Sequence, residues 1–172
     1  LQIAQPLVVN DTYQLGRYGE ITLADSRLMV PTDTMAPGKA AVEYYQQQQH
    51  RHMLVLDDGL YQQNPEPLQL GKLTISAANT LRIGDSVSNV SGVLLQDARG
   101  YRLVPTTTPV FNHTNPRPAK PAAKPVNALR VASFNVLNYF NGEGQQPAFP
   151  TRRGASTPAE LARQQAKTVA AL

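Results

Sequence analysis

The sequence has 172 residues, of which 41% are hydrophobic and 16% charged, a balance that allows a buried core and argues against wholesale disorder. It contains no Cys, which excludes disulfides and Cys-based zinc sites, and no apolar run approaches the roughly 20 residues that a membrane-spanning helix needs. The net charge of +4 is uneven: residues 1–115 hold eight cations and ten anions, giving −2, whereas residues 116–172 hold eight cations and two anions, giving +6.

The first fifty residues predict short strands and one helix. Residues 6–9 form a β-branched run that ends at an Asn-Asp turn. Residues 18–23 and 27–30 flank a three-residue loop and predict a hairpin whose alternation points Ile21 and Leu23 into the core. Good helix formers then fill residues 38–52, which predicts a short helix or an ordered loop.

The next segments predict further strands. Residues 53–56 are an apolar run closed by Asp-Asp-Gly, as in a buried strand that ends in a turn, and residues 61–76 contain enough Pro and Gly to predict an irregular excursion. Residues 81–95 and 101–104 predict a second hairpin, in which Gly92 permits a bulge or a sharp bend. The expected core residues of this hairpin are Val87, Val90, Val93 and Leu94.

These elements predict a mainly β domain over residues 1–115. Several short strands at such intervals, with one small helix between them, are typical of a small barrel such as an oligonucleotide-binding fold, and a sandwich is the alternative. Residues 116–128 follow as a linker, because their prolines, interleaved with Ala and Lys, neither extend a helix nor pair in a central strand.

The last segment, residues 129–172, predicts an incomplete α/β unit. Its apolar start at 129–136 is typical of a buried strand. Thr157 followed by Pro and then Glu160 is typical of a helix start, and Leu161, Gln165, Val169 and Leu172 form the stripe expected on that helix. One strand and one helix cannot bury a core, so we expect the start of a larger domain, here partly disordered or packed on the first domain or on a neighbour.

Residues 133–140, Ser-Phe-Asn-Val-Leu-Asn-Tyr-Phe, carry a resemblance to a known family. Together with Arg153-Gly154-Ala155 and the run 163–167, they resemble the opening of the endonuclease/exonuclease/phosphatase superfamily domain in large secreted bacterial nucleases. Segments 15–20, 54–59 and 101–103 resemble the accessory region that precedes that domain, so the likeness covers nearly the whole chain.

The resemblance implies a role for Asn135, which matches the first-strand asparagine of the superfamily. There it lies beside a divalent metal, usually Mg²⁺ with Ca²⁺ or Mn²⁺ as alternatives, and helps to orient the phosphate and the catalytic groups. A neutral amide does this without adding charge that repels phosphate. Read without the family, Asn135 is more simply a turn residue at the end of a strand.

The same resemblance implies the activity and setting of the parent protein: a secreted, metal-dependent endonuclease acting on extracellular DNA and in some cases RNA. The metal-binding Glu and the His and Asp residues of that family cannot be assigned here, so we expect this chain to be inactive by itself and to need no cofactor. The first residues lack the features of a signal peptide, and there is no initiating Met, so we expect the chain to begin inside a longer polypeptide.

A nucleic-acid-binding patch is also predicted on the first domain, at Arg17, Arg99 and Arg102. The net charge of −2 argues against strong binding by this domain alone, because affinity for the phosphate backbone depends mainly on cations. The alternative to the nuclease hypothesis is therefore a non-catalytic module that binds nucleic acid or only spaces its neighbours.

Overall fold

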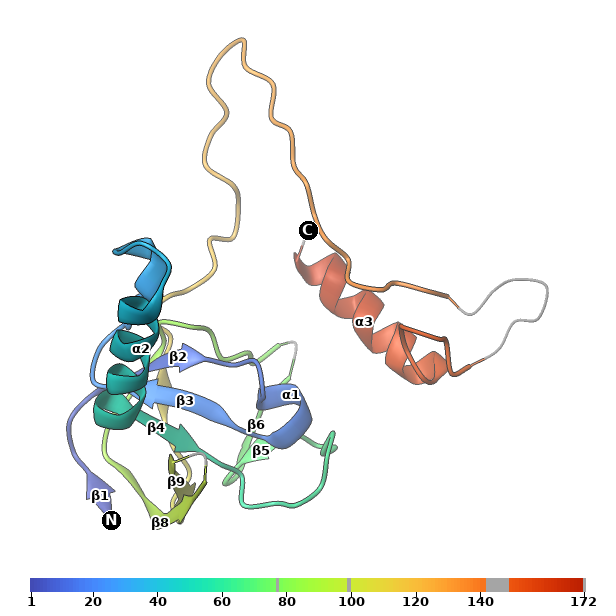
Figure 1. Cartoon of the computed structure of the whole chain (residues 1–172). Coiled ribbons are helices and arrows are strands. Elements are labelled where there is room, and N and C mark those ends of the chain that lie inside the picture. The colour runs from blue at the N-terminus through green and yellow to red at the C-terminus, as the bar shows by residue number, and fades with distance from the viewer. Residues whose placement is uncertain (77, 99, 142–148, 172) are drawn as a thin grey trace. The chain divides into compact units, whose positions relative to one another are not determined.

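The computed structural model describes residues 1–76, 78–98, 100–141 and 149–171. The chain divides into two compact units, Leu1–Arg117 and Pro118–Leu172. The second unit contains the helix α3 (Pro158–Ala171), and the first contains a β-rich domain (Figure 1). None of the helices in the described ranges has the length and hydrophobicity that crossing a bilayer requires.

The first unit is built mostly of short strands with two α-helices between them. In chain order its elements are β1 (Gln2–Ile3), β2 (Leu7–Asp11), α1 (Leu15–Tyr18), β3 (Ile21–Ala24), the 3₁₀ helix η1 (Pro31–Asp33), α2 (Lys39–His52), β4 (Met53–Leu56), β5 (Gln69–Leu70), β6 (Leu73–Thr74), β7 (Ser86–Val87), β8 (Val90–Asp97), β9 (Gly100–Pro105) and β10 (Phe111–Asn112).

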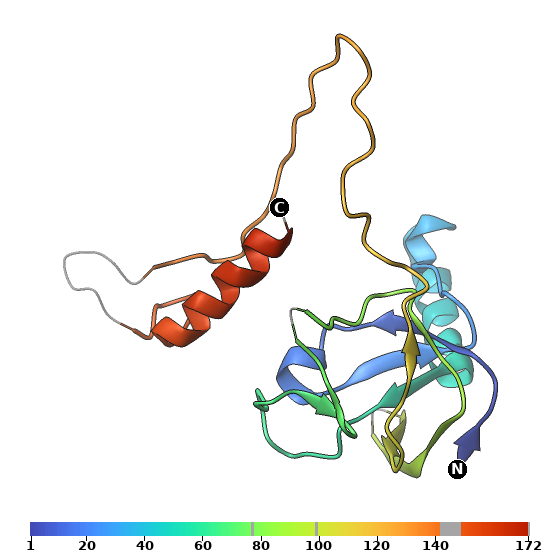
Figure 2. The ribbon, with the colours of Figure 1, turned by 180° about the vertical axis from the view of Figure 1, so that it is seen from behind.

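Eight of these strands form one sheet in the order β1-β8-β9-β4-β3-β2-β7-β10, and β5 pairs with β6 alone. The pairing of β4 with β9 is parallel, and every other neighbouring pair is antiparallel. The sheet curls into a half-barrel, seen from both sides in Figures 1 and 2. The prediction of a mainly β fold of the small barrel or sandwich type is confirmed.

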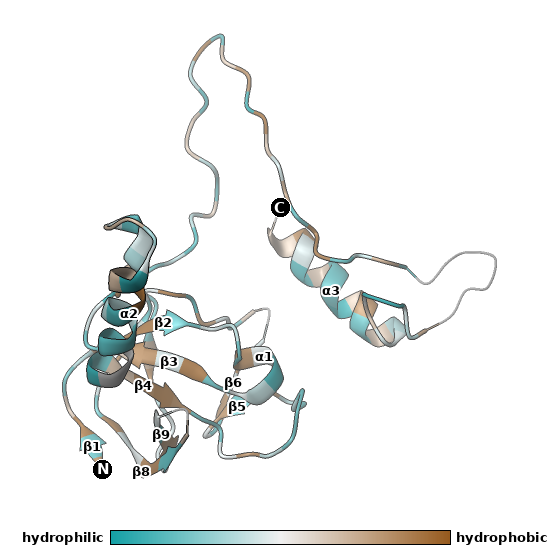
Figure 3. Ribbon diagram, in the orientation of Figure 1, coloured by the Kyte–Doolittle hydropathy of each residue, from teal (hydrophilic) through white to brown (hydrophobic). Residues whose placement is uncertain are grey.

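The core lies inside this curl and is made by alternate residues of the central strands. Ile21 and Leu23 of β3 and Leu56 of β4 are at most 1% exposed, as the alternation predicted for the first two. The apolar colour of β3 and β4 is visible in Figure 3. Burying each such side chain contributes on the order of 1.5–3 kcal/mol, so these strands anchor the domain.

The predicted hairpin between residues 18–23 and 27–30 is wrong. The antiparallel partners of β3 are β2 on one side and β4 on the other, so neither edge remains for residues 27–30. That segment instead runs past Asn10, whose Oδ1 accepts the backbone N–H of Leu28 at 2.8 Å and a guanidinium N–H of Arg27 at 2.9 Å.

The predicted core of the second hairpin is only half right. Val87 and Val90 are buried, but Val93 and Leu94 are 53% and 43% exposed, because β8 continues beyond the end of the core. Gly92 makes no bulge, since its ladder with β9 is regular from Gly92 to Asp97. Glycine is needed there for close approach: an added Cβ would lie 2.3 Å from the carbonyl oxygen of Val104.

Helix α2 and the strand after it agree with the sequence. Helix α2 covers residues 39–52 and buries Ala41, while Val42, Tyr44 and Tyr45 remain exposed. Strand β4 follows at once, and the turn after it is closed by the backbone N–H of Gly59, which donates to Asp57 Oδ1 at 2.8 Å.

Candidate functional site

The apolar segment 129–136 of the second unit is not a strand, which corrects the prediction. Leu129 and Val131 are 95% and 91% exposed, and the described residues of this unit contain no strand. A strand exists only where a second backbone supplies its hydrogen bonds. The described part of the second unit offers none, so a sequence with strand character remains unpaired.

Asn135 begins a tight turn at the end of this segment. Its Oδ1 accepts the backbone N–H of Leu137 at 2.9 Å. Leu137 at φ 45° and Asn138 at φ 49° both adopt left-handed backbone conformations. Asn tolerates that region well, whereas Leu adopts it rarely, so the turn must be held by contacts outside itself.

Helix α3 opens as the sequence predicted. The hydroxyl of Thr157 accepts the backbone N–H of Glu160 at 3.1 Å, which is an N-cap bond. In return Glu160 Oε2 accepts the backbone N–H of Ser156 at 2.7 Å, one residue before the position expected for a capping box. These bonds fix the residue at which the helix begins. From there, side chains three or four positions apart lie on the same face of α3.

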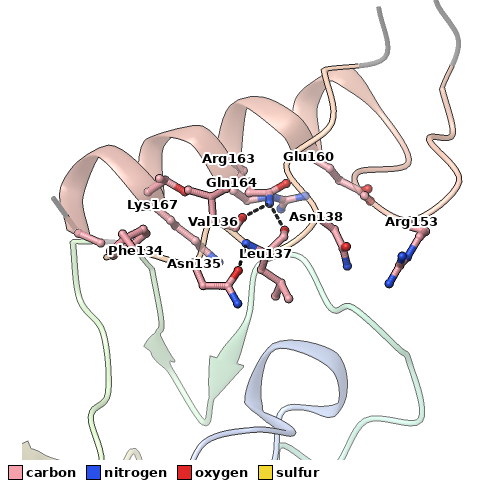
Figure 4. A pocket seen from close by; sticks show the side chains of 13 residues that line it. Phe134, Asn135, Val136, Leu137, Asn138, Arg153, Glu160, Arg163, Gln164 and Lys167 are labelled. Carbon is pink, nitrogen blue, oxygen red and sulfur yellow. Dashed lines mark hydrogen bonds between the residues drawn. The ribbon is translucent and has the colours of Figure 1, made fainter. Parts of the chain in front are cut away.

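One of those side chains, Gln164, holds the Asn135 turn. Its Nε2 donates to the carbonyl oxygen of Leu137 at 2.8 Å and to that of Val136 at 3.2 Å, as the dashed lines in Figure 4 show. Both bonds are made to backbone carbonyls within the turn. They couple the position of Asn135 to the face of α3.

Gly154 packs closely against this turn. An added Cβ at this residue would lie 2.5 Å from the carbonyl oxygen of Asn138 and 2.9 Å from Thr151 Oγ1. The same Thr151 hydroxyl accepts the backbone N–H of Gly154 at 2.9 Å and donates to the carbonyl of Ala155 at 3.0 Å. A side chain larger than hydrogen does not fit without moving the backbone.

The turn and α3 line an open pocket of about 520 Å³ (Figure 4). One wall is the segment from Phe134 to Asn138, and the other is the face of α3 that carries Gln164. The remaining lining residues are Arg153, Gly154, Glu160, Arg163, Lys167, Thr168 and Ala171.

The pocket is electropositive. Among the described residues that line it are three cations, Arg153, Arg163 and Lys167, and one carboxylate, Glu160. That carboxylate lies at the helix N-terminus, where it accepts the Ser156 N–H. The amide Nδ2 of Asn135 has no partner among the described residues, because the turn uses only its Oδ1. The arrangement is suited to an anion, with a neutral donor beside fixed positive charge.

A metal ion of the implied kind does not fit the described residues by themselves. In the described ranges no group of three His, Asp or Glu side chains is close enough to hold a metal. The described residues around Asn135 supply one carboxylate, Glu160, and this one already accepts the Ser156 N–H.

The structure describes two of the three residues of the predicted nucleic-acid patch, Arg17 and Arg102. Arg17 is exposed in α1; its Nη2 and Nε donate to Gln63 Oε1 at 3.0 and 3.2 Å, and its guanidinium lies 5.1 Å from the centre of the Tyr18 ring. Arg99 lies outside the described residues, as does Leu172 of the predicted stripe on α3.

Arg102 does not belong to a surface patch. It is buried in β9, where Nη1 contacts Glu20 Oε1 at 2.7 Å and Asp57 Oδ2 at 2.5 Å, and Nε contacts Asp97 Oδ2 at 2.8 Å. Burial alone lowers the pKa of Arg102, but its hydrogen bonds to Glu20 and Asp57 outweigh that effect, so the pKa is raised. Three carboxylates neutralise this cation, so it is not available to phosphate.

Sequence reasoning missed Gln164 and gave no role to Lys167. The signal that was present is helical spacing, since residues 160, 164, 167, 168 and 171 recur every three or four positions and share one face of α3. The partner of that face, the left-handed turn after Asn135, gave no comparable signal.

Comparisons with known proteins identify only the first unit. A family model described as a domain of unknown function, DUF8508, matches residues 1–115. No curated protein and no solved structure matches the chain. Because that family model covers more than half of the sequence, the chain belongs to the DUF8508 family.

Proposed function

We propose that this chain is part of a secreted, metal-dependent endonuclease that hydrolyses phosphodiester bonds in extracellular DNA, with RNA as a second substrate. In this proposal residues 1–115 form an accessory domain, residues 116–128 a linker, and residues 129–172 the first part of an endonuclease/exonuclease/phosphatase domain. The pocket of the second unit is its phosphate-binding portion.

The observation that carries the proposal is the placement of Asn135 in a pocket with three cations. Within it, Asn135 donates an N–H from Nδ2 to a phosphate oxygen, while Arg153 and Lys167 supply positive charge. Arg and Lys are the usual partners of phosphate, Arg as a planar fork and Lys as a point charge.

When bound, a divalent ion would supply the charge that activates water and stabilises the leaving group. The residues described here bind and orient the phosphate and perform no other step. Gln164 acts as a positioning residue, because it fixes the two carbonyls that follow Asn135.

The test is binding of a fluorescein-labelled DNA duplex to the 172-residue chain, measured by anisotropy at several salt concentrations in the absence of divalent metal. We expect Arg153→Ala and Lys167→Ala each to weaken binding and to reduce the slope of log K against log salt by about 0.9, the value for one phosphate contact.

Arg152→Ala is the matched control, because Arg152 is an exposed neighbour of Arg153 that does not line the pocket. Equal effects of all three substitutions would show binding by diffuse charge and contradict the proposed pocket. No measurable DNA binding would favour the second candidate, a spacer module, which the neutralised Arg102 of the first unit also favours.

A further inference from the structure

The linker lies in a long stretch of the sequence without acidic residues. Residues 98–142 contain no Asp or Glu, although they hold six Arg and Lys residues. Three of these six, Lys120, Lys124 and Arg130, are exposed and lie in the linker or just after it. In the described part of the chain none of the three side chains pairs with a carboxylate. Their positive charge is therefore available to an anion from outside.

A turn reverses the backbone between the second and third of these cations. The Ala128 N–H donates to the Pro125 carbonyl at 3.3 Å, and Asn127 adopts a left-handed conformation with φ 62°. A positive φ at the third of four residues is the signature of a type II turn, and Asn is one of the residues that fits there. The sequence of residues 125–128 thus explains why the chain folds back at this point.

Side-chain hydrogen bonds hold the cations near one another. Arg130 Nη2 donates to the carbonyl of Ala122, and Lys124 Nζ donates across the turn to the carbonyl of Ala128. Ala122 lies between Lys120 and Lys124 in the sequence, so the first bond returns Arg130 to the segment that carries both lysines. Both acceptors are uncharged carbonyls, so neither bond neutralises a cation. We call residues 120–130 the cationic turn.

We propose that the cationic turn is a second contact for the phosphate backbone of nucleic acid, separate from the pocket that contains Asn135. The inference rests on the proposed function for the identity of its ligand. Lys and Arg bind the phosphate backbone by displacing its condensed counterions, and this needs exposed cations but no shaped cavity. Such contacts hold the duplex without reading its bases, so the cationic turn binds DNA of any sequence.

The place of the cationic turn in the chain gives this contact a role. Asn135 follows Lys124 by eleven residues, so DNA held at the turn stays within about 40 Å of the pocket even when the chain is fully extended. Binding at the pocket then becomes an intramolecular step, which raises the effective concentration of phosphate there.

An anionic lipid surface is the other polyanion that attracts exposed cations. Segments that bind such surfaces usually carry about four to eight cations, beside a membrane helix or on an amphipathic helix. The cationic turn has three cations and is not helical. These features favour nucleic acid over a membrane.

The test repeats the anisotropy titration with duplex DNA at several salt concentrations, using Lys120→Gln, Lys124→Gln and Arg130→Gln in the 172-residue chain. Each substitution should reduce the slope of log K against log salt by about 0.9, the value for one phosphate contact. Lys72→Gln is the matched control, because Lys72 is an exposed lysine of the first unit and its loss changes the net charge equally. The control should leave the slope unchanged.

A further variant, Asn127→Val, tests the turn without changing any charge. A β-branched residue strongly disfavours a positive φ, so the turn is lost and Arg130 is no longer held near the lysines. Affinity should fall by about two- to tenfold, the cost of ordering one long side chain on binding. Unchanged affinity would contradict the gathering of the cations by this turn.

The two DNA contacts can fail separately. If Arg153→Ala and Lys167→Ala reduce the slope but the three substitutions in the cationic turn do not, the proposed pocket stands and the second contact is overturned. The reverse pattern supports the cationic turn and contradicts the pocket. If the turn substitutions weaken binding to vesicles that contain phosphatidylserine and leave DNA binding unchanged, the turn binds lipid and the inference is overturned.

Discussion

Arg102 and Glu20, separated by 82 residues in the sequence, form a buried ion pair of 2.7 Å that joins β9 to the residue before β3. Asp57, directly after β4, shares the same guanidinium nitrogen. Because β4 lies between β3 and β9 in the sheet, this one cation stabilises three neighbouring strands at the same level.

We predict that Arg102→Met lowers the free energy of unfolding by about 3–5 kcal/mol, the usual result of removing one partner from a buried ion pair. The loss arises because Glu20 and Asp57 would stay buried while losing their ion pairs with this guanidinium. Urea unfolding followed by circular dichroism measures it. Arg17→Met is the control, since Arg17 is exposed and its loss should change stability by less than about 0.5 kcal/mol. A similarly small loss of stability for Arg102→Met would contradict the buried ion pair and indicate that Arg102 is a surface cation.

Asp58 gives a pH-dependent prediction. Burial raises its pKa, the negative charges of Asp57 and Glu20 raise it further, and Oδ2 has no hydrogen-bond partner in the described structure. With a raised pKa in the folded state, ionisation of Asp58 opposes folding at pH values above that pKa, and this cost disappears as pH falls below the ordinary value of 3.8.

Asp58→Asn should therefore increase the free energy of unfolding at pH 7, and the gain should shrink as the pH is lowered toward 3.8. Asn Oδ1 can still accept the Leu60 N–H that Asp58 Oδ1 accepts at 2.8 Å. Chemical unfolding of both proteins across this pH range gives the comparison. A stability difference that stays constant with pH would show that the charge of Asp58 is not responsible.

Two glycines of the first unit should respond in opposite ways to alanine. At Gly92 the added Cβ meets the Val104 carbonyl oxygen, so Gly92→Ala should destabilise the sheet by about 1–3 kcal/mol through overpacking. At Gly16, in α1, nothing lies within 4 Å, so Gly16→Ala should be neutral or stabilise by up to about 1 kcal/mol. Thermal unfolding of the pair decides this, and similar melting temperatures would refute the close approach at Gly92.

Local signals explain what could be predicted from the sequence. Alternation placed Ile21 and Leu23 in the core, and the Thr157 to Glu160 spacing located the start of α3, because both patterns depend on residues only a few positions apart. Arg102 could not be placed this way. Arginine is usually exposed, and the carboxylates that bury it come from distant segments.

The candidate site shows the same division. A resemblance identified Asn135. The hydrogen bonds from Gln164 to the turn depend on the left-handed backbone of Leu137 and Asn138, which no residue spacing in the sequence predicts. The apolar segment 129–136 has the composition of a strand, and what it lacks is a neighbouring backbone among the described residues. Strand pairing depends on which other backbone lies beside a segment, so composition alone predicted a strand where the structure has none.

Substitution of Gln164 tests the positioning of Asn135 separately from the charge of the proposed pocket. Gln164→Ala removes the bonds to the carbonyls of Val136 and Leu137 and changes no charge. It should weaken DNA binding at every salt concentration by a similar factor and leave the slope of log K against log salt unaltered. Lys167→Ala should instead lower that slope, because it removes a phosphate contact. If Gln164→Ala has no effect on binding, the turn at Asn135 is not part of the nucleic-acid interface.

Catalysis gives the last prediction. Hydrolysis of a phosphodiester needs an activated water and charge stabilisation on the phosphate, and the described pocket offers side-chain amides, three cations and a carboxylate engaged at a helix start. We therefore expect the purified 172-residue chain to leave plasmid DNA uncut in the presence of Mg²⁺. Asn135→Ala, prepared in parallel, identifies contaminating nuclease, since cleavage that is equal in both samples does not come from this pocket. Cleavage by the chain that Asn135→Ala abolishes would show that these residues already form a working centre, and the proposed division of the active site would be wrong.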